Sequence, residues 1–166
     1  MLWRQRVRQS LHFSTEDINQ FRWFERNGFS ALRKQPGNDD FRIEGVCLCG
    51  ITAQPPHPEI HKTALGAEES VSWKYFEHTE DAVSWLKQQG YKVLAVEQCE
   101  GSTMLQDFVR QPKEKYAVVL GNEVKGVQQQ VVDMCDGCLE IPQYGTKHSL
   151  NVSVTAGIVL WHLSKK

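Results

Sequence analysis

Short apolar runs alternate with helix-like segments along most of this chain, and this alternation constrains the fold more than any other feature. Each run is rich in Val, Leu or aromatic residues, and each stops at a glycine, a proline or a polar residue. Such runs are typical of buried strands. The expected strands are 45–51, 71–76, 91–96, 117–120 and 138–141.

Helical patterns lie between these runs. Thr79 is expected to cap a helix over Glu80–Gln89 that stops at Gly90, and further helices are expected over Leu105–Arg110 and Val127–Cys135. Strands that alternate with helices predict an α/β fold, with a mostly parallel sheet flanked by helices.

The two ends of the chain are expected to be helical. Ser14–Asp17 resembles a cap for a helix that runs to about Arg26, and no strand is predicted before residue 43. At the other end, an apolar face through Ala156, Leu160 and Leu163 predicts a helix that begins near Ser149, with the serine as its N-cap.

Length and composition indicate a single cytoplasmic domain. The chain has 166 residues, of which 40% are hydrophobic. It has no apolar run near the roughly 20 residues that span a bilayer, and no apolar secretory segment follows its basic start. The net charge of −1 gives no global field for a polyanion, although a local basic patch remains open. Five cysteines predict buried or half-buried reduced thiols.

A loop with two glycines follows the expected strand at 117–120. Gly121 and Gly126 have the spacing of a phosphate-binding loop, but Val127 and Gln128 stand where that motif needs Lys and Ser or Thr. The glycines instead allow close backbone approach to a ligand, with Glu123 at the loop's centre. An ordinary strand-to-helix turn is the alternative.

A zinc hydrolase or deaminase is a further alternative. Cys135 and Cys138 form a C-x-x-C, and His57 and Glu59 resemble the other half of a deaminase motif. Met134 replaces the proline of that motif, and the two halves are far apart in the sequence. Buried or half-buried thiols are therefore favoured, and no metal is expected.

The segment 141–151 is the second polar loop. Pro142 ends the strand at 138–141, Gly145 permits a sharp turn, and hydrogen-bond donors precede an expected helix start. A helix N-terminus favours carboxylate or phosphate ligands. Together with the loop at Gly121, it predicts two adjacent walls of one pocket.

These two loops resemble a known family. LGNEVKGV (120–127) is similar to the second motif of the SpoU/TrmH family of RNA 2′-O-ribose methyltransferases, and IPQYGTKHSLNVSVTAGIVLW (141–161) is similar to its third. The resemblance runs from about Phe41 to Trp161, so 41–166 is expected to be the catalytic domain and 1–40 a poorly matched segment. It implies an S-adenosylmethionine-dependent enzyme acting on tRNA or rRNA, with the SPOUT fold and its deep C-terminal trefoil knot. It also implies a homodimer. No membrane or DNA partner is expected.

The resemblance also implies the site. The cofactor pocket would include Val96, Glu97, Gly121, Ile141 and Leu150, and the polar residues at the reaction centre would include Glu123, Ser149 and Asn151.

The family's first motif is altered here. Asn27, Ser30 and Arg33 keep its spacing, while Phe29 replaces its glycine and Lys34 its threonine. Asn27 and Arg33 are carried over as catalytic, with Arg33 as the activating residue and Arg42 as the fallback. A catalytically impaired member that binds RNA or cofactor is the alternative.

Overall fold

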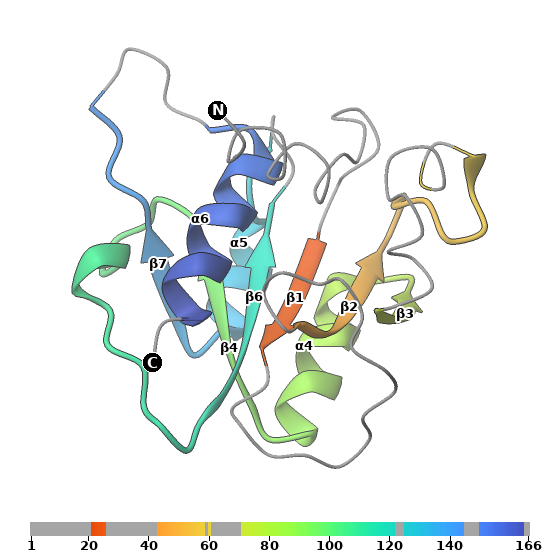
Figure 1. The fold of residues 1–166 in the computed structure, drawn as a ribbon, viewed down its shortest axis with the longest axis horizontal. Helices are drawn as coiled ribbons and strands as arrows, with labels where there is room; N and C mark the ends of the chain where they lie inside the picture. The colour runs from red at the N-terminus through yellow and green to blue at the C-terminus, as the bar shows by residue number, and fades with distance from the viewer. Residues whose placement is uncertain are drawn as a thin grey trace, which may run out of the picture.

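The computed structural model describes residues 21–25, 43–58, 60, 71–121, 125–144 and 150–164, and the statements below concern these residues. One sheet holds seven strands in the order β3-β2-β1-β6-β4-β7-β5 (Figure 1). The strands are β1 (Phe21–Glu25), β2 (Ile43–Cys49), β3 (Ser72–Phe76), β4 (Tyr91–Val96), β5 (Thr103–Met104), β6 (Lys115–Leu120) and β7 (Gly137–Glu140).

All strands except β1 run in one direction. β2 is parallel to β3, and β6, β4, β7 and β5 form a continuous parallel set. β1 lies between these two groups and is antiparallel to β2 on one side and β6 on the other. The predicted mostly parallel α/β sheet is confirmed.

Helices cover both faces of this sheet (Figure 1). They are α4 (Thr79–Gln88), α5 (Gln129–Met134) and α6 (Val152–Ser164), with a 3-10 turn, η1, at Leu105–Asp107. Alternate residues of β4 and β6 enter two separate cores: Val93 and Val119 join the cluster under α4 and α5, whereas Leu94 and Val118 join the cluster under α6. Central strands buried on both faces explain why their sequences read as continuous apolar runs.

The N-terminal helix prediction is wrong over residues 21–25, which form β1. The backbone of β1 pairs along both edges, with Phe21 opposite both Leu48 and Leu120. Pairing on two sides outweighs a local capping signal, because intrinsic propensity is a weak guide once tertiary partners exist. Residues 14–20 and 26 lie outside the described part of the chain.

The C-terminal helix is confirmed, but it begins at Val152 rather than near Ser149. Asn151 is its N-cap: its side-chain Oδ1 accepts a hydrogen bond from the Ser153 N–H at 2.9 Å, and its carbonyl accepts one from Thr155 N at 2.9 Å. Asparagine is among the strongest N-cap residues, so it takes this position. Ser149 lies outside the described residues.

Other boundaries moved by a few residues. Thr79 is the buried first residue of α4 rather than its cap, and His78 at the cap position makes no side-chain cap hydrogen bond. The helix expected at 105–110 is only η1, α5 is shorter than expected at both ends, and β5 was not predicted. Gly90 has φ of 81°, consistent with its expected role in stopping α4.

The cysteine prediction is confirmed. Cys47, Cys49 and Cys138 are buried, Cys99 and Cys135 are half-buried, and none of these five cysteines is in a disulfide. Within the described ranges, no helix has the length and apolar character needed to cross a membrane.

Candidate functional site

The carboxyl ends of β4, β6 and β7 meet at one edge of the sheet, which we call the carboxyl edge. Val96, the last residue of β4, is in register with Leu120 of β6 and Leu139 of β7. The Glu97 N–H continues this pairing with a 3.1 Å hydrogen bond to the Leu139 carbonyl. Ligands of parallel α/β sheets bind at such edges.

This edge brings together most of the predicted cofactor residues. Gly121 directly follows β6 and Ile141 directly follows β7, so both lie beside Val96 and Glu97. All are half-buried. Leu150 is 36% exposed and precedes the α6 cap. Figure 1 shows α6 beginning at the end of the molecule toward which the arrowheads of β6 and β7 point.

The Glu97 carboxylate holds the loop that follows β6. Its Oε2 accepts a hydrogen bond from Val127 N at 2.8 Å, and its Oε1 accepts one from Gln98 N at 3.0 Å. Val127 is buried, with 6% of its surface exposed. Hydrogen bonds to an ionised acceptor are stronger than neutral ones. Glu97 is therefore a structural clamp on this loop.

The two glycines let the same loop close on itself. A Cβ on Gly121 would lie 2.1 Å from the Gly126 carbonyl carbon and 2.3 Å from Val127 N. Gly126 has φ of 63°, and a Cβ there would lie 2.2 Å from Glu97 Oε2. The missing side chains of Gly121 and Gly126 thus allow close contacts within the protein itself, whereas the predicted approach of this backbone to a ligand stays a prediction.

A buried thiol also forms a hydrogen bond with Glu97. Cys138 Sγ donates a hydrogen bond to the Glu97 carbonyl at 3.2 Å. Burial, followed by the neighbouring Cys99 thiol, raises the pKa of Cys138 to about 12. The thiol therefore stays neutral near pH 7 and keeps its proton for this hydrogen bond.

The zinc alternative gains no support from the described part of the chain. Cys135 donates to the Val131 carbonyl at 3.1 Å, so the two thiols of the C-x-x-C have different partners. No three His, Cys, Asp or Glu residues are grouped for a metal among the residues described. Glu59 lies outside them.

The predicted catalytic residues are largely outside the described ranges. Asn27, Arg33, Glu123 and Ser149 fall there, as does the fallback Arg42. Asn151 is described and exposed, and its carbonyl and its Oδ1 both serve the α6 cap.

A strand precedes the altered first motif, although no strand was predicted before residue 43. β1 ends at Glu25, two residues before Asn27. The aromatic content of FRWFE was the available signal, because aromatic residues favour strands. Glu25 pairs with Tyr116, so the chain leaves β1 at the amino end of β6, opposite the carboxyl edge. An extended chain covers roughly 3.3 Å per residue, so Arg33 is within reach of either edge.

Comparison with known proteins identifies the family. The family model of the SpoU rRNA Methylase family matches residues 38–161. The tRNA (guanosine(18)-2′-O)-methyltransferase of Thermus thermophilus is 30% identical over 114 residues, which are 66% of this chain and 55% of that protein. The 23S rRNA (guanosine-2′-O-)-methyltransferase of Coxiella burnetii is 29% identical over 109 residues, 66% of this chain and 42% of that protein. The chain spans about half the length, or less, of these relatives.

Solved structures share the fold. An AdoMet-bound rRNA methyltransferase from Sinorhizobium meliloti matches with a TM-score of 0.66 at 25% identity, over 74% of this chain and 46% of that one. A TrmH-family RNA methyltransferase from Porphyromonas gingivalis matches with a TM-score of 0.64 at 25% identity, over 74% and 49%. Since the family model covers most of the chain, including both glycine-bearing loops, this protein belongs to the SpoU rRNA methylase family.

Proposed function

We propose that this protein transfers a methyl group from S-adenosylmethionine to a ribose 2′-hydroxyl of tRNA or rRNA. The observation that carries the proposal is the close approach of Gly121 to Gly126 and Val127 at the carboxyl edge, where Glu97, which follows Val96, holds Val127. The relatives named above as tRNA and rRNA 2′-O-methyltransferases support the same reaction.

The cofactor would bind at the carboxyl edge. Val96 and Ile141 are half-buried apolar side chains there, suited to cover an adenine ring, and Gly121 exposes backbone. Leu150 completes the proposed set. Because the Glu97 carboxylate already holds Val127, we assign Glu97 a role through its backbone and through the clamp. When bound, the cofactor supplies a methyl group on a positively charged sulfur.

The polar residues would act on the ribose. A hydroxyl oxygen attacks the methyl carbon while the carbon–sulfur bond breaks, so the hydroxyl proton must leave and the oxygen's developing charge needs stabilisation. Arg33 stays protonated, so its role is to stabilise that charge; Glu123 is the carboxylate able to accept the proton. Asn27, Ser149 and Asn151 would position the ribose.

Methyl transfer from labelled cofactor to total tRNA and rRNA tests this function. We expect label in dinucleotides that resist alkaline hydrolysis, because a methylated 2′-oxygen cannot attack the adjacent phosphate. Glu123→Ala and Asn151→Ala should lose transfer, while the control Glu77→Ala, an exposed residue just after β3, should keep it. Full transfer by both site variants would refute the assignment. Cofactor binding without transfer would identify the impaired member instead.

A homodimer and the trefoil knot belong to the same proposal. Val154, Ile158 and Trp161 are 50%, 36% and 56% exposed, and their spacing places them on one side of α6, away from its buried residues. Such an apolar stripe suits a subunit interface. Ile158→Glu should give a monomer in light scattering, and an unchanged mass would refute this interface. The knot rests on the family resemblance and the single-domain organisation on the length and composition of the chain, and a crystal structure tracing the whole chain tests both. The cytoplasmic location remains a prediction from the sequence.

A further inference from the structure

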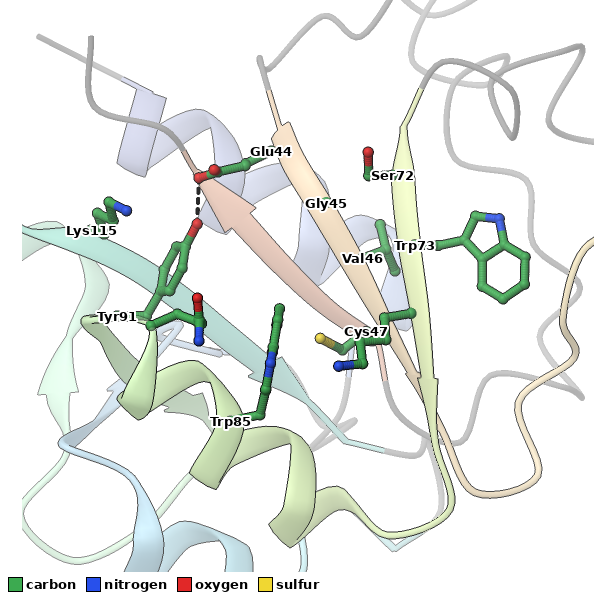
Figure 2. A pocket seen from close by; sticks show the side chains of 11 residues that line it. Glu44, Gly45, Val46, Cys47, Ser72, Trp73, Trp85, Tyr91 and Lys115 are labelled. Atoms are coloured by element: carbon green, nitrogen blue, oxygen red, sulfur yellow. Dashed lines mark hydrogen bonds between the residues drawn. The ribbon is translucent and has the colours of Figure 1, made fainter. Parts of the chain in front are cut away.

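A separate hollow lies at the amino ends of the strands, far from the carboxyl edge. It has a volume of about 400 Å³ and is lined by residues of β2, β3, β4 and β6 together with the end of α4 (Figure 2). Tyr91 opens β4 and lines this hollow, whereas Val96 closes β4 at the other edge. At about 3.3 Å per residue, the two are roughly 16 Å apart along the strand.

The hollow has a buried floor and an exposed rim. Gly45, Cys47 and Tyr91 are buried, while Lys74, Lys115 and the other rim residues Ser72 and Gln89 are exposed. Alternate strand residues face the same side, so Gly45 faces α4 as Cys47 does and adds no side chain to the floor. A volume of this size fits a small ligand rather than a single water.

Aromatic rings and cations meet around this space. The Lys74 ammonium lies 4.5 Å from the centre of the Trp85 ring, and the Lys115 ammonium lies 5.2 Å from the centre of the Tyr91 ring. Figure 2 shows Trp85 pointing up from α4 into the hollow, between Tyr91 and Cys47. The Tyr91 hydroxyl donates a hydrogen bond to the Glu44 carboxylate. This hydrogen bond holds the carboxylate, a hydrogen-bond acceptor, at the inner wall.

We propose that this hollow binds a nucleotide, with the base against Trp85 and the phosphate at Lys74 and Lys115. An aromatic face flanked by lysines is the combination that binds single nucleotides of any sequence. Glu44 and Gln89 supply polar groups for the edge of the base. Given its distance from Val96, the bound nucleotide is not the one that receives the methyl group. It is either a neighbouring nucleotide of the substrate RNA, which rests on the proposed function, or a free nucleotide.

Calorimetric titration of the full chain tests the proposal with two probes, guanosine 5′-monophosphate and a single-stranded octanucleotide RNA. The variant Lys74→Gln/Lys115→Gln keeps most of each side chain and removes both charges. We expect it to bind the mononucleotide about tenfold more weakly, the loss typical of one hydrogen bond to a charged group. Lys113→Gln, an exposed lysine outside the hollow, is the matched control.

The two probes separate the two sources. Weaker binding of both probes identifies the hollow as an RNA-binding surface. The dependence of octanucleotide binding on salt should then fall by about 0.7 in log–log slope for each phosphate that the variant no longer neutralises. Weaker mononucleotide binding with no octanucleotide binding identifies a free nucleotide. Absence of binding in the unmodified protein, or equal affinity of the double variant and Lys113→Gln, overturns the proposal.

A second variant and a second measurement distinguish a failure of this proposal from a failure of the proposed function. Gly45→Val leaves both lysines in place and fills the floor, so it should also lose the mononucleotide while its circular dichroism stays unchanged. Retained mononucleotide binding by Gly45→Val would overturn the assignment of the base to this hollow. S-adenosylmethionine binding, measured on the same preparations, should be equal in all variants, since its proposed site is at the other edge. No cofactor binding by the unmodified protein would count against the proposed function and not against the hollow.

Discussion

Removal of the Glu97 carboxylate should open the loop that follows β6. In Glu97→Ala, Val127 N loses an acceptor at 2.8 Å and Gln98 N one at 3.0 Å. A hydrogen bond to a charged group contributes about 1.5–3 kcal/mol. Glu97 is half-exposed, and the hydrogen bond that it accepts from Gln98 N is exposed to solvent, so water replaces part of the lost free energy. We therefore take about 2 kcal/mol as the net contribution of the two hydrogen bonds.

This free energy sets the expected loss of cofactor affinity. About 1.4 kcal/mol corresponds to a factor of ten, so the closed form of the loop becomes up to roughly thirtyfold less favoured relative to the open form. If S-adenosylmethionine binds only the closed loop, its apparent dissociation constant rises as the fraction of closed form falls. Calorimetry should therefore show weakening of about tenfold to thirtyfold.

Two control variants test whether the loss of affinity comes from the Glu97 carboxylate. Glu97→Gln keeps an oxygen acceptor and loses only the charge, so its effect should be smaller than that of Glu97→Ala. Glu100→Ala removes an exposed carboxylate from the loop after β4, which also carries Glu97, and this variant should bind the cofactor normally. Wild-type affinity in Glu97→Ala would show that the clamp does not govern the cofactor site.

Three further predictions concern the same edge and its surroundings. Gly126→Ala places a Cβ 2.2 Å from Glu97 Oε2 at a φ of 63°, so chemical denaturation should show a loss of about 1–3 kcal/mol; unchanged stability would mean that the loop does not close as described. Asn151→Ala removes the α6 cap and should cost about 1 kcal/mol, whereas Asn151→Asp should keep the cap and still lose methyl transfer; equal stability of both variants would contradict the capping role. The pKa of Cys138 is raised from 9.0 to about 12, so the folded state favours the neutral thiol, and stability should be complete below pH 9 and fall as the pH rises toward 12. Thermal unfolding of Cys138→Ala should show a weaker fall over that range, and an identical alkaline profile would show that another group is responsible.

The strands of the parallel set were predictable from the sequence because their burial is uniform. Val93, Leu94 and Ala95 are all buried, so β4 appears as a continuous apolar run whose bounds, Tyr91–Val96, were predicted correctly. β1 was missed because its partners are remote in sequence, and short strands of mixed character carry little local signal.

The carboxyl edge was predictable only in part. Val96, Gly121 and Ile141 each lie at the end of an apolar run, and the rule for parallel sheets places such positions together. The clamp was not predictable, because Glu97 and Val127 are 30 residues apart and nothing local to either indicates the hydrogen bond. The hollow at the amino ends depends on how Trp85 of α4 lies against β2 and β4, which pattern alone does not determine.

The hydrogen bonds of Glu97 predict how the carboxyl edge opens locally. The Glu97 amide donates to Leu139, its carboxylate holds Val127, and its carbonyl accepts from Cys138, so one residue ties the end of β4 to β7 and to the segment that precedes α5. Amide hydrogens that share such a tie exchange with solvent through a shared opening event. The amides of Glu97 and Val127 should therefore show a common protection factor in hydrogen exchange and slow together when cofactor binds. Entry to the site would then be a collective loosening of the end of β4, of β7 and of the segment before α5, rather than the motion of a single flap.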